Sequence, residues 1–268
     1  MAWCWLNATE SKPQNVSSKP GQTKSIKNKM TEITKYSIDK EINTLGFLKN
    51  LIVKFNDLYF VGDFDGKTFK LDPDFAKRLE NEKAVWADYG KDNYAGVTWS
   101  NIPDSDGRKL FVGWMSNWEY ANKVPTKNWR SATTIPRELK LLNTDGHYRI
   151  VSQPVKELDK YISKTIKKEL LTIDKTTVIV DKNTVDMARL DIRFTMNGLV
   201  EDQYDFVLSN TANNAIHFGI NKKEKCFYVD RKKVSQISFS EEFAKKISKA
   251  SIFSDFDTIE VRVVIDKT

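Results

Sequence analysis

The sequence predicts an all-β protein, and three features of its 268 residues support this class. Aromatic residues make up 12% of the chain, and aromatic and β-branched side chains are favoured on pleated surfaces. Apolar runs of strand length recur along most of the chain, and several alternate with polar residues. Short turns rich in Asp, Asn and Gly separate these runs. This pattern is typical of antiparallel sheets rather than of parallel strands joined by helices.

Residues 1–45 differ from the rest of the chain. The stretch SKPQNVSSKPGQTKSIKNK is rich in Ser, Lys, Pro, Gln and Asn and poor in apolar residues. Such a segment cannot bury enough apolar surface to offset the entropy lost on ordering. We therefore expect residues 1–45 to be a disordered leader, with a short helix near TEITKYSIDKEI. The start, MAWCWLNATE, lacks the basic flank and apolar length of a signal peptide, so the localisation stays unknown.

Residues 46–153 are predicted to form a first β domain. The stretch LIVKFNDLYFVGDFDGKTFKL has apolar runs broken by Asn-Asp and Asp-Gly, which predicts strand, turn, strand with a hairpin at Asp65-Gly66. Two later stretches repeat this pattern. Their predicted turns lie at Asp106-Gly107 and Asp145-Gly146.

The second half begins with a connector over residues 154–171, in which VKELDKYISKTIKKELL has helical spacing. Strand-like stretches then resume over 172–268. They are TTVIVD, ARLDIRFTM, QYDFVLSN, AIHFGIN, CFYVDR and TIEVRVVID. Their alternation suits a β-sandwich with one solvent-exposed face per sheet. Because the chain stops directly after a strong strand that has no hairpin partner, we expect this sandwich to be truncated.

Composition argues against several functions. The net charge is +7, but the lysines are dispersed and no nucleic-acid motif accompanies them, so nucleic-acid binding is not predicted. No apolar run is long enough to span a membrane. The two cysteines and two histidines make no metal-ligand pattern, and no metal or cofactor is predicted.

Five of the seven tryptophans lie between residues 86 and 129. Flat rings stack on the C–H faces of sugars, while neighbouring Asp, Asn, Tyr and Lys side chains bind hydroxyls, so this cluster suits a carbohydrate site. Trp114 and Trp118 lie beside Gly, Ser and Asn in GWMSNWEYA, which favours that interpretation. For Trp86, Trp99 and Trp129, on strand-like flanks, a place in a sheet core stays an equal alternative.

Four ordered motifs carry a family resemblance: YFVGDFDGKTF, WADYGKDNYAGVTWSNIP, DGRKLFVGWMSNWEYANKVPT and NWRSATTIPRELKL. Together they resemble the later part of glycoside hydrolase family 32, the β-fructosidases that include levanases, exo-inulinases and invertases. The similarity is strong from Tyr59 to Leu158 and continues weakly into FYVDRKKVSQISFSEEFA. It implies the last blades of a partial five-bladed β-propeller, followed by an incomplete β-sandwich.

The resemblance also implies that no catalytic residue is present. The family hydrolyses glycosides through a nucleophilic Asp and an acid Glu. These lie in WMNDPNG and EC motifs, and a stabilising Asp lies in an RDP motif. None of the three motifs occurs in the chain, where the only Asp-Pro is Asp72-Pro73, preceded by Leu71. Glu119 belongs to WMSNWEYA and is not the acid. We therefore expect the chain to be inactive on its own.

Substrate-binding positions are nevertheless implied, with a fructan or sucrose-type carbohydrate as ligand. The predicted residues are Asp88, Lys91, Asp92, Tyr94, Trp114, Asn117 and Trp118. Asp88 read alone is a turn-capping carboxylate, whereas Arg130 and Arg137 are expected to form ion pairs between blades. Three functions stay open: a glycosidase-family chain, a fructan-binding module, and a structural fragment completed by a polypeptide that supplies the missing blades.

Overall fold

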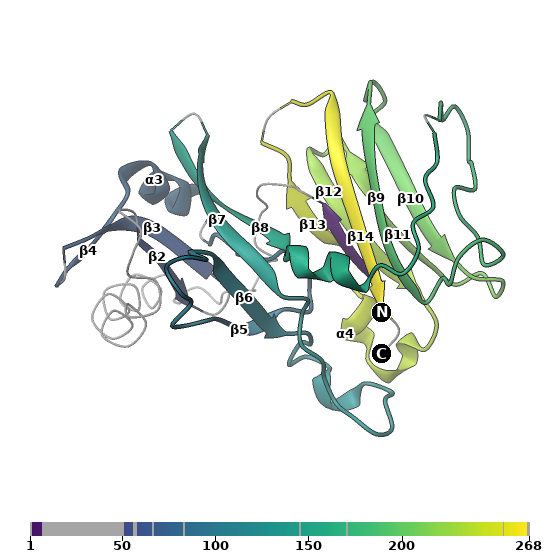
Figure 1. Cartoon of the computed structure of the whole chain (residues 1–268), viewed down its shortest axis with the longest axis horizontal. Helices are drawn as coiled ribbons and strands as arrows, with labels where there is room; N and C mark the ends of the chain where they lie inside the picture. Colours follow the sequence, from purple (N-terminus) through teal and green to yellow (C-terminus); the bar gives the residue numbers. More distant parts are fainter. Residues whose placement is uncertain are drawn as a thin grey trace.

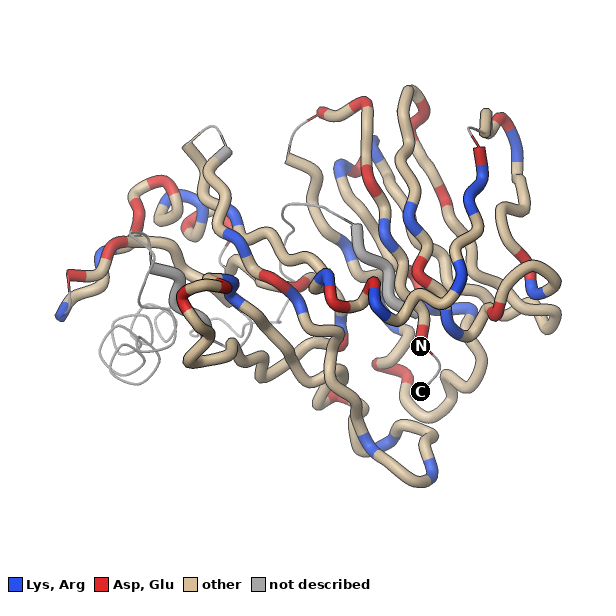
Figure 2. Tube along the Cα trace, in the orientation of Figure 1, with Lys and Arg blue, Asp and Glu red and all other residues tan. Residues whose placement is uncertain are grey.

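The computed structural model consists mainly of strands in four antiparallel sheets (Figure 1), which confirms the all-β class. The described residues are 2–6, 51–55, 58–65, 67–82, 84–144, 146–169, 171–253 and 255–266. Residues 7–50, with most of the predicted leader and its short helix, lie outside this set. In Figure 2 basic and acidic residues are interspersed along the trace in both halves of the molecule.

The first sheet has the order β2-β3-β4, with strands β2 (Leu51–Phe55), β3 (Leu58–Phe64) and β4 (Phe69–Leu71). Helix α3 (Pro73–Glu82) follows it, and no helix was predicted here. Asp72 caps the helix, because its Oδ1 accepts a hydrogen bond of 2.9 Å from the Phe75 amide, and Pro73 suits the first helical turn. Phe75 then packs on the ring of Tyr59, with 5.4 Å between centroids.

The second sheet is a meander in chain order. Its strands are β5 (Tyr94–Thr98), β6 (Lys109–Trp114), β7 (Arg137–Thr144) and β8 (His147–Pro154). Leu141, Tyr148 and Ile150 from this sheet pack against the buried core of the first sheet. The two sheets therefore share one apolar core, and they lie side by side in Figure 1.

Turns join these strands where Asp-Gly pairs occur in the sequence. The β3–β4 hairpin pairs Phe64 with Phe69, and Asp65 accepts hydrogen bonds from the next two described amides. Gly107 and Gly146 have φ angles of +64° and +85°, a region that glycine adopts without steric cost. The three predicted hairpin positions are therefore confirmed, apart from Gly66 and Asp145, which lie outside the described residues.

Helical spacing was predicted over Val155–Leu171, but the helix found among the described residues of the connector is a short 3-10 helix, η2 (Lys156–Tyr161). The described residues from 162 to 188 form no helix or strand. TTVIVD was predicted as a strand, and this was wrong. Val178 in this stretch is exposed, and β-branched residues there pair with no other described strand.

The sandwich consists of a three-stranded sheet, β1-β14-β9, and a four-stranded sheet, β10-β11-β12-β13. The strands are β1 (Ala2–Leu6), β9 (Arg189–Asn197), β10 (Gln203–Ser209), β11 (Ala215–Asn221), β12 (Cys226–Lys233), β13 (Ser248–Ser251) and β14 (Thr258–Asp266). Residues 2–6 were expected in a disordered leader but pair antiparallel with β14. AWCWL is an apolar run in that polar leader, and β14 offers it a hydrogen-bonding edge.

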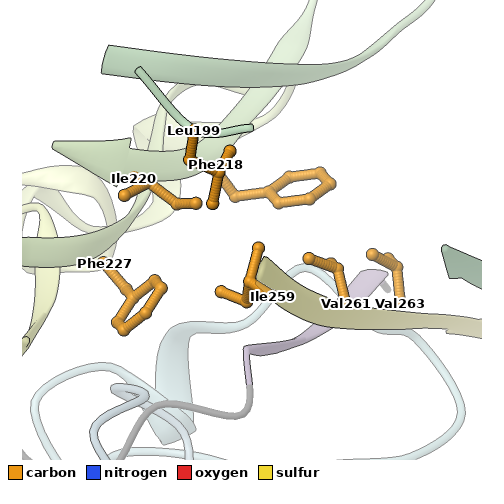
Figure 3. Close-up of a cluster of buried hydrophobic side chains, with 7 residues drawn as sticks. All are labelled: Leu199, Phe218, Ile220, Phe227, Ile259, Val261 and Val263. Atoms are coloured by element: carbon orange, nitrogen blue, oxygen red, sulfur yellow. The ribbon is translucent and has the colours of Figure 1, made fainter. Parts of the chain in front are cut away.

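The core of the sandwich lies between its two sheets (Figure 3). Ile259, Val261 and Val263 alternate along β14 and face Phe218 and Ile220 of β11. This period of two is the pattern from which the sandwich was predicted.

A carboxylate cluster ties the connector to the sandwich. Asp191 on β9 accepts hydrogen bonds of 2.7 Å from both Arg193 and Arg262. Arg193 also pairs with Asp159 of η2. Burial by itself would raise the pKa of Asp191, but the two arginines outweigh it and lower that pKa below its usual 3.8.

We predict that Asp191→Asn lowers the free energy of unfolding by about 1–3 kcal/mol at neutral pH, because charge-assisted hydrogen bonds are lost. The pKa of Asp191 is lower in the folded state than in the unfolded state. Its stabilisation is therefore present above the unfolded pKa and disappears as the pH falls through the folded pKa. Urea unfolding of both proteins across this acid range measures the difference. A difference in the free energy of unfolding between wild type and variant that is the same at about pH 2 as at neutral pH would contradict the prediction.

Candidate functional site

The seven predicted substrate-binding residues come from two stretches that the β5–β6 pairing brings together. One stretch runs through residues 88–94 and enters β5, and the other leaves β6 through residues 114–118. Tyr94 is the register partner of Trp114. In addition, Asn117 donates a hydrogen bond of 3.0 Å to the Lys91 carbonyl oxygen. The two stretches thus form one surface at the end of the second sheet.

Three aromatic rings lie in contact on this surface. The Trp114 and Trp118 rings lie 4.9 Å apart, and the Tyr94 ring lies 6.2 and 6.4 Å from them. Trp118 is 67% exposed. We call Tyr94, Trp114 and Trp118 the aromatic trio. It presents flat apolar area to solvent, together with the polar indole and phenol groups that bind hydroxyls.

Asp88 is held by hydrogen bonds at both carboxylate oxygens. Oδ1 accepts from the Gly90 amide at 2.7 Å, and Oδ2 accepts from Arg137 at 2.7 Å. Arg137 is buried, with its guanidinium 4.7 Å from the centroid of the Phe111 ring. These contacts confirm the turn-capping interpretation of Asp88 and the ion pair expected of Arg137.

Arg130 differs from that expectation. It donates hydrogen bonds to the carbonyl oxygens of Val124 and Thr126, the latter at 3.0 Å. Its guanidinium pairs with no carboxylate in the part of the chain that the structure describes. The predicted ion pair of Arg130 was therefore wrong, because the loop that follows η1 (Ala121–Lys123) offers it backbone acceptors instead.

Lys91 lies in the segment that precedes β5 of the second sheet and points toward the sandwich. Its side chain is buried, and Nζ donates a hydrogen bond to the carbonyl oxygen of Glu242 in the short helix α4 (Glu241–Ala244). The Glu119 carboxylate lies 3.9 Å from the same Nζ. Burial lowers the pKa of Lys91, and the nearby charge of Arg231 lowers it further. Lys91 is thus engaged at the boundary between the two β units.

Asp92 makes the main polar contact across this boundary. Its carboxylate accepts hydrogen bonds from Arg231 of β12 and from the Tyr120 hydroxyl. Arg231 also donates to the Tyr120 hydroxyl at 2.6 Å and to the Phe243 carbonyl oxygen at 2.5 Å. We call Asp92, Tyr120 and Arg231 the interdomain anchor. Burial and the Asp92 charge raise the pKa of Tyr120, so its hydroxyl keeps its proton.

The structure therefore divides the predicted site. Trp118 of the trio is exposed and its two neighbours are half-buried. Asp88 and Asn117 accept hydrogen bonds within turns, and Lys91 and Asp92 contact the sandwich. Substrate binding by each of the seven stays a prediction. Sequence reasoning missed Tyr120 and Arg231, because no local sequence pattern predicts a contact between residues more than a hundred positions apart.

Asn93 was missed as well. Its side chain is buried, and neither its Oδ1 nor its Nδ2 has a hydrogen-bond partner among the described residues. A Cβ at Gly113 would lie 1.9 Å from Asn93 Oδ1, so only glycine leaves room for this amide. Gly113 precedes Trp114, and this close approach explains the glycine of the GWMSNW motif.

Within the described ranges, no group of three or more His, Cys, Asp or Glu side chains is arranged to hold a metal ion. None of the described helices has the length and apolar character needed to cross a membrane.

A family model described as the N-terminal domain of glycosyl hydrolases family 32 matches residues 3–154. The chain belongs to this family. It is 35% identical over 211 residues to a levanase of Bacillus subtilis (strain 168) and 29% identical over 218 residues to an extracellular exo-inulinase of Aspergillus niger. These matches cover 78% and 76% of this chain, but only 30% and 40% of the two relatives. The chain thus spans 30% and 40% of the length of these two relatives, well under half of each.

The fold comparison agrees with the family. The crystal structure of an exo-inulinase from Aspergillus awamori superposes with a TM-score of 0.57 at 22% identity, over 78% of this chain and 47% of that one. This likeness confirms the predicted fold class, part of a propeller followed by a sandwich. The sheets β2-β3-β4 and β5-β6-β7-β8 do not close a ring, as expected for part of a propeller.

Proposed function

We propose that this chain binds a fructan or sucrose-type carbohydrate at the end of its second propeller sheet, and that the 268-residue polypeptide does not cleave it. Membership of family 32, with levanase and exo-inulinase relatives, supports a role in the hydrolysis of such sugars at the level of the family. The observation that carries the binding proposal is the aromatic trio, since an exposed Trp118 ring in contact with the half-buried Trp114 ring offers a stacking surface to sugar rings.

Lack of cleavage is proposed from the sequence. Glycoside hydrolysis requires two carboxylates placed on either side of the scissile bond. The family motifs that carry them are missing from the 268 residues. The carboxylates of Asp88 and Asp92, in the stretch that leads into Tyr94, each pair with an arginine, so both are already engaged in contacts within the chain.

Trp118→Ala is predicted to weaken binding to levan about tenfold, or about 1.4 kcal/mol, because it removes the most exposed ring of the trio. Native electrophoresis through gels that contain increasing levan concentrations measures this affinity. Trp99→Ala is the matched control. Trp99 is also exposed, at 43%, but it comes directly after the last residue of β5, whereas Tyr94 of the trio is the first residue of that strand. Equal retardation of wild type and Trp118→Ala would contradict the proposal.

A polypeptide that supplies the missing blades was the alternative role. The open pair of propeller sheets is compatible with it, but no contact among the described residues supports a partner, and this role stays a prediction.

A further inference from the structure

A second cluster of polar side chains lies on the four-stranded sheet of the sandwich, away from the aromatic trio. Asp205 of β10 bonds to two neighbours: His217 Nδ1 lies 2.8 Å from its Oδ2, and the Tyr228 hydroxyl donates to its Oδ1 at 2.9 Å. Gln203 donates to the Tyr228 hydroxyl at 3.4 Å. We call Gln203, Asp205, His217 and Tyr228 the outer-face cluster.

The cluster faces solvent and not the core. Tyr204 and Phe206, the neighbours of Asp205 on β10, pack against the buried core between the sheets. Successive side chains of a strand point to opposite faces, so Asp205 points outward. Asp205 and His217 both keep about a third of their side-chain surface exposed. A ligand can therefore reach the cluster directly from solvent.

Gly219 shapes this surface. Tyr228 and Asp205 are the register partners of Gly219 on either side, so strand β11 separates them by roughly 10 Å. A hydrogen bond across that gap requires the Tyr228 side chain to lie across β11. A Cβ at Gly219 would lie 3.0 Å from the Tyr228 hydroxyl and 1.9 Å from the Tyr204 carbonyl oxygen, so glycine is what leaves this space. The phenol ring is thus laid along the sheet beside a carboxylate.

The cluster retains hydrogen-bonding capacity for a ligand. Each Asp205 oxygen accepts one bond from the described residues, which leaves further lone pairs free. The hydrogen bond at Nδ1 fixes the His217 ring, and its Nε2 has no partner in the described part of the chain. An amide, an imidazole, a carboxylate and a phenol ring together match the hydroxyls and C–H faces of a sugar.

The charges around the cluster define the ligand further. Lys249, the register partner of Tyr228 on β13, is already paired with Glu224, so a ligand meets the carboxylates of Asp205 and of Asp230, the register partner of His217. A carboxylate disfavours phosphates and acidic sugars. A neutral, hydroxyl-rich chain fits best.

We propose that the outer-face cluster is a second carbohydrate-binding site, which takes a neutral polysaccharide such as levan. It goes beyond the proposed function, because it lies on the sandwich and does not use the aromatic trio. Two sites on one chain raise retention on a polymer through effective concentration, even where each site alone is weak.

The test measures levan affinity by electrophoresis for wild type, Tyr228→Ala, Trp118→Ala and the double variant. We expect Tyr228→Ala to weaken binding about threefold to tenfold, and the double variant to bind more weakly than either single variant. Tyr161→Ala is the matched control, since Tyr161 is 84% exposed in η2 and is expected to leave affinity unchanged. Asp205→Asn keeps the side-chain size and is expected to weaken binding at an unchanged melting temperature, which separates binding from folding.

The outcomes distinguish the two proposals. If Tyr228→Ala and Asp205→Asn bind levan like wild type while Trp118→Ala does not, the outer-face site is refuted and the propeller site stands. If only the outer-face variants lose affinity, the propeller site is refuted and the outer-face site stands. Absence of levan binding by the wild-type chain refutes both.

Discussion

Replacement of Arg231 by alanine is expected to lower the free energy of unfolding by about 2–5 kcal/mol, as for other desolvated charge pairs that lose one partner. Arg231 is only 16% exposed and pairs with Asp92 across the boundary between propeller sheet and sandwich. Its guanidinium also lies 3.8 Å from the centroid of the Phe243 ring. Alanine would leave the Asp92 carboxylate largely buried without its cation. Urea unfolding followed by fluorescence measures the loss.

Arg189→Ala is the control for this experiment. Arg189 is 77% exposed and pairs with Asp186, and exposed pairs contribute at most about 1 kcal/mol. Because the anchor joins two separate cores, Arg231→Ala is also expected to split unfolding into two transitions. A single transition at the wild-type midpoint would show that the anchor does not couple the two units.

The sequence predicted much of the fold because the strands of the sandwich alternate clearly, as in Ile259, Val261 and Val263 of β14. Asp-Gly pairs likewise placed the hairpins. The errors have physical causes. TTVIVD has strand propensity but pairs with no described strand, and propensity without a ladder partner does not make a strand. Helix α3 was missed because Asp72-Pro73 was considered only as a possible match to the family's RDP motif. Its second interpretation, an N-cap followed by a first-turn proline, was not considered.

The residues of the candidate site could be predicted only where a pattern within one short stretch of sequence points to them. The clustering of tryptophans identified Trp114 and Trp118, which the structure brings into contact with Tyr94. Asp88 and Asp92, four positions apart, resemble an acid–base pair when read alone. Their partners are Arg137 and Arg231, and neither pairing follows from spacing, because it depends on how distant strands pack.

The second large expected effect is a complete lack of hydrolysis. A retaining glycosidase needs an acid and a nucleophile roughly 5–5.5 Å apart, one of which must hold a proton near neutral pH. The family's motifs for these groups do not occur in this chain. We therefore predict that the purified chain binds levan and leaves it intact.

The most direct test is the release of fructose from levan, inulin and sucrose by the purified 268-residue chain, measured beside levan retention of the same preparation. We predict retention on levan together with fructose at the level of a protein-free blank. Fructose release that rises in proportion to the protein concentration would contradict the claim that this chain binds its carbohydrate without cleaving it.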